Sequence, residues 1–124
     1  MCIRDRASAA LLNALKVTGR KMGECKIVIN GAGAAGISVA KLLLSMNFGE
    51  IVMCDIKGII YEGADWLTEP QMQMAKVTNP GKKKGTLADA LVGADVFIGV
   101  SKPNLVSQEM VATMEKDPII FRCV

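Results

Sequence analysis

Four short apolar runs recur along the chain, and none of them alternates with polar residues. They are Ile27-Val28-Ile29, Ile51-Val52-Met53, Val96-Phe97-Ile98 and Ile119-Ile120-Phe121. Continuous apolar runs of this kind are typical of β-strands that are covered on both faces, as in parallel sheets with crossover helices. Helix-forming segments lie between the runs, so the pattern predicts an α/β fold, a doubly wound parallel sheet built from βαβ units.

The expected elements follow from this pattern and from local capping signals. Strands are predicted at 26–30, 50–55, 94–100 and 118–121, and helices at 7–17, 34–46, 87–94 and 107–116. Thr86, with Asp89 three residues on, is a good N-cap for the third of these helices. The segment 57–85 is less regular, and within it a possible helix begins near Pro70 and ends near Val77.

A glycine-rich stretch joins the first predicted strand to the helix that follows it. Gly31, Gly33 and Gly36 have the spacing G-x-G-x-x-G, with a strand before it and a helix beginning inside it, as in dinucleotide-binding βαβ units. Gly31 permits a tight turn, Gly33 lets the backbone approach a pyrophosphate, and Gly36 allows the helix to pack close to the sheet. The helix N-terminus would offer free N–H groups and its positive dipole end to the anion.

An acidic residue at the end of the next strand supports this interpretation. Asp55 follows the glycines by about 20 residues, the position of the acid that binds the adenosine ribose. Its charge would oppose a 2′-phosphate and so favours NAD over NADP, although Lys57 weakens that argument. Ser101 and Asn104, after the predicted strand 94–100, could contact the ribose or nicotinamide end or serve only as turn residues. Alternatively, the glycines serve only helix–strand packing and Asp55 is a surface carboxylate.

Composition and charge narrow the function classes. The 124 residues are 51% hydrophobic with a net charge of +3, and the one dense basic run, Lys82–Lys84, has no interleaved aromatics that would indicate nucleic acid. The four cysteines, Cys2, Cys25, Cys54 and Cys123, form no C-x-x-C pair, and histidine is absent, so they are not expected to build a metal site. Scattered free thiols indicate a reducing cytoplasm, and no apolar run approaches the roughly 20 residues of a membrane span. We expect a cytoplasmic protein with neither a nucleic-acid nor a membrane partner.

Six blocks of sequence are together far more specific than the glycine motif. They are ALLNALKVTGRK, KIVINGAGAAGISVAKLLL, CDIKGIIYEG, AKVTNP, GTLADALVGADVFIGVSKPN and MEKDPIIF. Over about residues 8–121 the chain resembles the NAD-binding domain of the bacterial malic enzymes, the oxaloacetate-decarboxylating malate dehydrogenases. The resemblance implies a Rossmann-like domain in an enzyme that oxidises L-malate to pyruvate and CO₂, with NAD as hydride acceptor and Mg or Mn polarising the substrate.

The resemblance assigns roles only where residues match. The family's cofactor loop is matched by Gly31, Ala32, Gly33, Ala34, Ala35 and Gly36. Asp55 matches its ribose-binding acid, and Ser101 matches the loop near the nicotinamide end. In the family, the proton-transfer tyrosine and lysine and the acidic metal ligands precede the helix at Ala7, and a malate-binding asparagine follows the strand at 119–121. No catalytic or metal-binding residue is therefore assigned to this chain.

Both ends depart from the family pattern. MCIRDR, at 1–6, has the look of a translated sequencing adapter or assembly junction, and the chain ends in RCV. We expect a non-native junction at 1–6 and an incomplete NAD-binding domain at 7–124 of a homodimeric parent enzyme, binding NAD weakly at most and not turning over malate. Two alternatives stay open: a stand-alone dinucleotide-binding regulatory module, and the cofactor domain of another dehydrogenase such as an amino-acid dehydrogenase.

Overall fold

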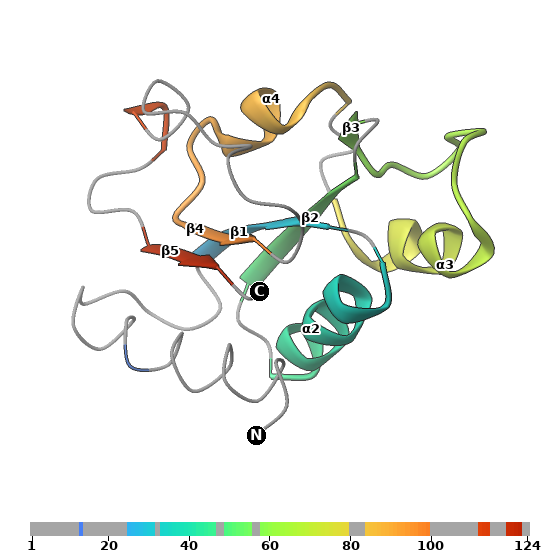
Figure 1. Ribbon diagram of the computed structural model, residues 1–124, viewed down its shortest axis with the longest axis horizontal. Coiled ribbons are helices and arrows are strands. Elements are labelled where there is room, and N and C mark those ends of the chain that lie inside the picture. Colours follow the sequence, from blue (N-terminus) through green and yellow to red (C-terminus); the bar gives the residue numbers. More distant parts are fainter. Residues whose placement is uncertain are drawn as a thin grey trace.

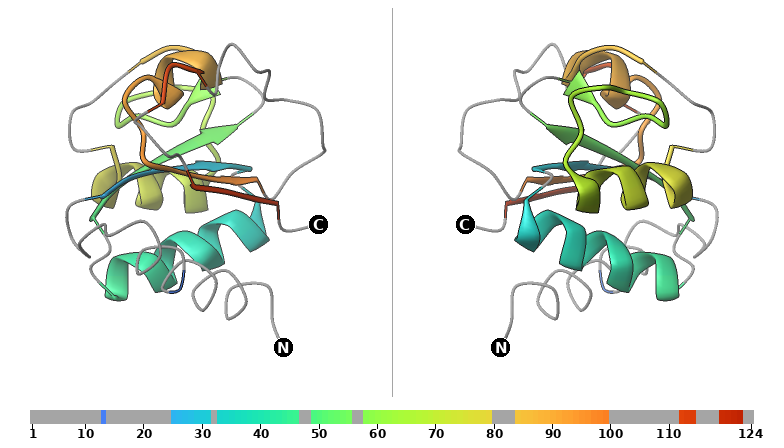
Figure 2. Two further views of the ribbon diagram at one scale, coloured as in Figure 1. Left: turned by 90° about the vertical axis from the view of Figure 1, so that its left-hand side faces the viewer. Right: turned by 90° about the vertical axis from the view of Figure 1, so that its right-hand side faces the viewer.

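A β-sheet forms the middle layer of the molecule, with helices on both of its faces. The computed structural model describes residues 13, 25–31, 33–46, 49–55, 58–79, 84–99, 112–114 and 119–122. Figure 1 shows the five-stranded sheet between α4 on one side and α2 on the other, and both side views in Figure 2 show the same layers. The predicted α/β architecture is confirmed.

The sheet is mostly parallel and reverses its strand order at the first strand. Its strands are β1 (Cys25–Asn30), β2 (Gly49–Asp55), β3 (Gly58–Ile59), β4 (Val96–Gly99) and β5 (Ile119–Arg122), in the order β3-β2-β1-β4-β5. β1 pairs in parallel with both β2 and β4, and β4 pairs in parallel with β5. The chain therefore continues to one side of β1 and later returns to the other. In open α/β sheets, ligands bind beyond the carboxyl ends of the strands at such a switch point.

The edge strand β3 departs from the predicted all-parallel sheet. It runs antiparallel to β2, with Cys54 opposite Ile59 and Asp55 opposite Gly58. Only residues 56 and 57 separate β2 from β3. A parallel neighbour needs a crossover of about a dozen residues or more, whereas two residues suffice for a hairpin. The short connection therefore dictates the direction of β3.

One face of the sheet is covered by α2 (Ala34–Ser45) and α3 (Glu69–Val77). The buried cluster on this face contains Ile27, Ile29, Ile51, Met53, Val96 and Ile98 from the strands, Val39, Ala40 and Leu43 from α2, and Met74 and Ala75 from α3. Both helices lie where the sequence predicts them. Among the helices described, none combines the length and the apolar character that crossing a membrane requires.

The opposite face is covered by α4 (Leu87–Leu91). Its cluster contains Val28, Cys54, Ile59, Ala90, Leu91, Ala94, Phe97 and Met114. Successive residues of β1 join different clusters because side chains alternate across a strand, and both faces are apolar, which explains the uninterrupted apolar runs. The predicted helices 7–17 and 107–116 lie outside the described residues, except that Asn13 and Ala112 are described and helical.

Candidate dinucleotide-binding site

The carboxyl ends of β1 and β2 bring the glycine turn (Gly31 to Gly36) beside Asp55. Asn30, the last residue of β1, is in register with Cys54 of β2. The backbone N–H of Gly31 then donates a hydrogen bond to the carbonyl oxygen of Cys54, at 2.9 Å. Asp55 is the next residue of β2. The sheet thus places the turn and the acid on adjacent strands at one edge, as the sequence predicts.

Gly31 makes the turn out of β1 in a conformation that favours glycine. Its φ is +124°, in the region that side chains with a Cβ rarely adopt. The chain turns there and enters α2, whose N-cap is Gly33 and whose first helical hydrogen bond runs from the Ile37 N–H to the Gly33 carbonyl, at 3.0 Å. The requirement for glycine at Gly31 is therefore one of backbone geometry.

The N-terminus of α2 is open. Gly33 makes no side-chain cap hydrogen bond, and the first turn holds no acidic residue. The first N–H groups of a helix have no partner inside the helix, so here they are available to an anion, with the helix dipole favouring negative charge. Gly33, Ala34 and Ala35 are exposed, and a Cβ added to Gly33 would meet no atom within 4 Å. The turn thus has both the donors and the space that a pyrophosphate needs.

Gly36 faces the other way. It is buried on the side of α2 that carries Val39, Ala40 and Leu43, against the sheet. A residue without a side chain at this point lets the first turn of α2 lie close to β1. This position agrees with the packing role predicted for the third glycine.

Asp55 is half-buried at the end of β2 and is held by a residue that the sequence analysis missed. The Nε2 amide of Gln71, in α3, donates a hydrogen bond to Oδ2 of Asp55 at 3.5 Å, which is long. Oε1 of the same side chain accepts the Thr68 backbone N–H at 3.1 Å. Gln71 is only 6% exposed, so its amide has little freedom to turn away. The spacing Thr68-x-x-Gln71 matches a capping box and could have drawn attention to this residue.

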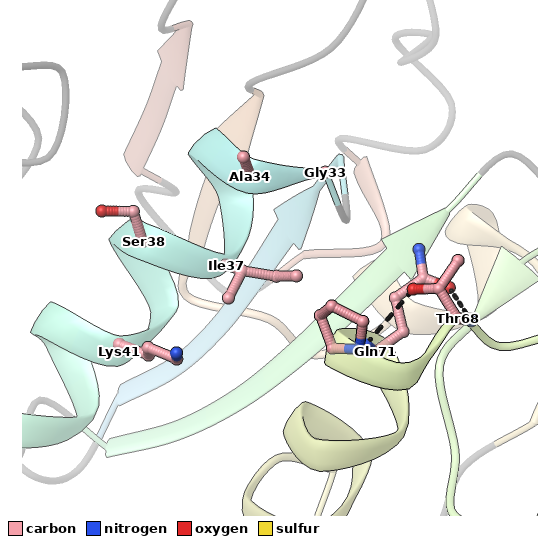
Figure 3. Close-up of a pocket in the computed structure, with 8 residues that line it drawn as sticks. Gly33, Ala34, Ile37, Ser38, Lys41, Thr68 and Gln71 are labelled. Atoms are coloured by element: carbon pink, nitrogen blue, oxygen red, sulfur yellow. Dashed lines mark hydrogen bonds between the residues drawn. The ribbon is translucent and has the colours of Figure 1, made fainter.

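A pocket lies between α2 and α3 and borders the glycine turn (Figure 3). Its volume is about 520 Å³, and it is lined by Gly33, Ala34, Ile37, Ser38, Lys41, Thr68, Pro70 and Gln71. Figure 3 shows the side chains of Ile37 and Lys41 pointing from α2 toward α3. The pocket therefore extends from the open start of α2 to Gln71, the hydrogen-bond partner of Asp55, with one cation on its wall.

Comparison with known proteins assigns this arrangement to a family. The chain matches the family described as "Malic enzyme, NAD binding domain" over residues 6–123. It belongs to that family. A nicotinamide dinucleotide is therefore the ligand class of this malic enzyme domain, and the alternatives of a regulatory module or an amino-acid dehydrogenase domain are less supported.

Individual relatives agree with the family. The bifunctional malic/malolactic enzyme of Bacillus subtilis (strain 168) is 52% identical over 114 residues, which are 91% of this chain and 28% of that protein. The NADP-dependent malic enzyme of Rhizobium meliloti (strain 1021) is 44% identical over 117 residues, 93% of this chain and 15% of that protein. The crystal structure of the NAD-dependent malic enzyme of Thermotoga maritima has a TM-score of 0.92 at 43% identity, covering 96% of this chain and 32% of that one. The chain thus spans less than a third of each relative.

The buried thiols of this malic enzyme domain are structural. Cys25 and Cys54 are both buried, and burial raises the pKa of Cys54 to about 12. The Cys54 thiol therefore stays protonated at neutral pH, although the residue adjoins Asp55 and its carbonyl holds the glycine turn. A protonated, buried thiol is a poor nucleophile and a poor metal ligand.

Several predicted site residues lie outside the described part of the chain. These are Ala32, Ser101 and Asn104, together with Lys57, which bears on the choice of cofactor. Their roles stay predictions. Within the described ranges, no group of three or more His, Cys, Asp or Glu side chains could hold a metal ion.

Proposed function

We propose that this domain binds NAD for a malic enzyme, with the pyrophosphate at the start of α2 and the adenosine ribose at Asp55. The observation that carries the proposal is the open N-terminus of α2 beside Asp55, joined to β2 by the bond from Gly31 to Cys54. A phosphate accepts hydrogen bonds from backbone N–H groups, and a carboxylate accepts them from ribose hydroxyls. The two groups therefore complement neighbouring parts of one ligand.

Different residues of the site would bind the pyrophosphate and the ribose. The N–H groups of the first turn of α2, from Gly33 to Gly36, would hold the pyrophosphate, and the helix dipole would favour its charge. Asp55 would accept hydrogen bonds from the 2′- and 3′-hydroxyls, while Gln71 keeps one of its carboxylate oxygens in place. When bound, the dinucleotide accepts hydride from the substrate, and the role of these residues is to orient it.

Asp55 also supports NAD as the preferred cofactor. A 2′-phosphate would bring its charge against the carboxylate, and like charges at close range disfavour binding. Relatives of both preferences are known: the Rhizobium protein is NADP-dependent by name and the Thermotoga protein NAD-dependent. Lys41 lines the adjoining pocket, and it is the lysine there that would attract a phosphate group.

For the whole protein we propose oxidative decarboxylation of L-malate to pyruvate and CO₂ in a homodimer. The names of the relatives and the family match support this reaction. A bound Mg or Mn ion would supply a Lewis acid to the substrate, with its ligands and the proton-transfer groups outside the residues described here. Sequencing the surrounding genomic DNA tests this part, because an upstream reading frame should encode the acidic metal loop and the catalytic tyrosine and lysine.

The cofactor assignment is tested by binding of NAD and NADP to the purified chain and to Asp55→Asn. We expect NAD to raise the unfolding temperature of the unchanged chain, since a ligand that binds only the folded state stabilises it. In Asp55→Asn the affinity for NAD should fall about 10-fold, because a carboxylate that accepts from the ribose hydroxyls is lost. The affinity for NADP should stay the same or rise, because the charge that repels the 2′-phosphate is removed. Isothermal titration calorimetry measures both affinities.

Glu50→Gln is the matched control, because it removes one negative charge from the opposite end of the same strand. Glu50 is exposed and lies at the amino end of β2. Its removal should leave the ratio of NAD to NADP affinity unchanged. Equal losses for both cofactors in Asp55→Asn, or no binding of NAD by the unchanged chain, would contradict the proposal.

A further inference from the structure

Asn30 is a buried polar side chain for which the described structure offers no partner. It is the last residue of β1 and is 6% exposed. The other buried polar residues have partners: the Thr78 hydroxyl donates to the Met74 carbonyl at 2.7 Å, and the Asn79 amide donates to the Ile60 carbonyl at 3.2 Å. Within the described part of the chain, the Asn30 carboxamide makes no such bond. This isolation distinguishes it from its equally buried counterparts.

An unpaired carboxamide at this depth lowers the stability of the fold. A buried amide loses its hydrogen bonds to water and regains nothing unless a protein group or a ligand takes their place. An apolar side chain of similar size would avoid that loss, and the preceding β1 residues Ile27, Val28 and Ile29 are all apolar. Unsatisfied buried polar groups therefore call for a cause, and a ligand that arrives later is one.

The place of Asn30 in the sheet indicates which ligand atoms it can reach. In register it lies between Cys54 of β2 and Gly99 of β4. Gly99 is half-buried and has no side chain, so its position in β4 puts no side chain next to that of Asn30. By alternation with Val28, the Asn30 side chain lies on the face of the sheet that α4 covers, opposite the face covered by α2. It thus stands at the switch point between β1 and β4.

We propose that the Asn30 carboxamide binds the ribose in the second half of the dinucleotide, the half that carries the nicotinamide. This inference rests on the proposed function. If the pyrophosphate lies at the start of α2 and the adenosine at Asp55 on β2, the remaining half passes to the other side of β1, over the end of β4. Its ribose presents hydroxyls that both donate and accept, which matches the amide and the carbonyl of Asn30.

Asn30→Leu in the purified chain tests the inference with three ligands. The unfolding temperature without ligand should stay the same or rise, because an unpaired polar group is removed. The affinities for NAD and for ADP-ribose should both fall about 10-fold, as expected when one buried hydrogen-bonding group to a ligand is lost. The affinity for AMP, which lacks the second ribose, should stay within about 2-fold of the unchanged chain. Asn30→Val repeats the test with a smaller side chain.

Asn79→Leu is the control for a buried carboxamide with a structural role. Its side chain is partnered and its φ is +51°, so this variant should lose stability. Lower unfolding temperatures for both Asn30 variants would show that Asn30 stabilises the fold, as Asn79 does, and would overturn the inference. It is also overturned if AMP binding falls as much as NAD binding, or if NAD binding does not change. Failure of the unchanged chain to bind NAD and AMP overturns the proposed function, and this inference with it.

Discussion

The N-termini of α2 and α3 lie on the same side of the sheet, yet they are completed in opposite ways. At α3 the Thr68 hydroxyl accepts the Gln71 N–H at 3.4 Å, Gln71 accepts the Thr68 N–H at 3.1 Å, and Glu69 adds an acid to the first turn. At α2 the N-cap is Gly33, without a side-chain hydrogen bond and without an acidic residue. One helix start has side-chain partners for its N–H groups, and the other has none.

The difference has a measurable energetic side. Compared with glycine, a good side-chain N-cap contributes roughly a few tenths of a kcal/mol to helix stability, and α2 forgoes this contribution. α4 follows the example of α3, because Asp89 accepts the Thr86 N–H at 2.9 Å. Among the described helices, α2 is the one whose N-cap residue has no side chain and whose first turn holds no acidic residue. The open end is therefore found at the place where an anion is expected, and four substitutions test that interpretation.

The largest effect is expected from Gly33→Asp, which would make α2 resemble α3. Gly33 has an extended backbone (φ −84°, ψ −167°) that aspartate adopts, and its side chain would enter open space. The new cap should raise the free energy of unfolding by roughly a few tenths of a kcal/mol. Its charge should lower the affinity for NAD by about 100-fold or more, since it occupies the pyrophosphate position. Calorimetric titration and thermal unfolding measure the two effects.

Gly33→Asn separates the cap from the charge, because asparagine caps a helix as well as aspartate does. Its loss of NAD affinity should be clearly smaller than that of Gly33→Asp. Unchanged NAD binding in both variants would show that the open end of α2 is not the anion site.

A smaller effect is expected from Gln71→Met, which removes a cap of α3 and the contact to Asp55 together. Asp55 would keep its charge but lose a donor that orients it, so the affinity for NAD should fall about 3-fold. Stability should fall by about 1 kcal/mol as half of the capping box is lost. The same NAD affinity in Gln71→Met and in the unchanged chain would mean that the long bond to Asp55 has no part in binding.

The smallest effect on binding is expected from Thr68→Ala, which removes the hydroxyl of the capping box and leaves the amide of Gln71 intact. Stability should fall by about 1 kcal/mol, measured by urea unfolding. NAD affinity should change by less than about 2-fold, because hydrogen bonds at this cap do not reach the ligand. A loss as large as that of Gln71→Met would place the α3 cap itself in the binding site.

The sequence predicted the elements whose signal is local. The apolar runs gave β1, β2, β4 and β5 their positions, and the start of α3 near Pro70 was visible from its helix-breaking residue. Gly31 and Asp55 were found because the turn and the strand end have fixed positions in a βαβ unit. The sheet then brought them together through the pairing of β1 with β2.

Features that depend on contacts between elements were not predicted. The bond from Gln71 to Asp55 joins residues 16 positions apart, and no periodicity in either segment indicates it. The direction of β3 depends on the length of its connection, which the irregular segment 57–85 obscured. Asn30 was placed at the end of a predicted strand, but only its burial and the absence of a partner in the described structure drew attention to it.

The hydrogen bond from Gly31 to Cys54 fixes the glycine turn relative to the strand that ends in Asp55. That bond, at 2.9 Å, holds Gly31 against the end of β2, so the start of the turn lies one strand spacing, about 4.8 Å, from the strand that ends in Asp55. A small molecule that carries only an anion or only a vicinal diol would occupy one of the two proposed binding groups and leave the other unoccupied. If the proposed function holds, the backbone selects ligands by their length before any side chain selects between bases.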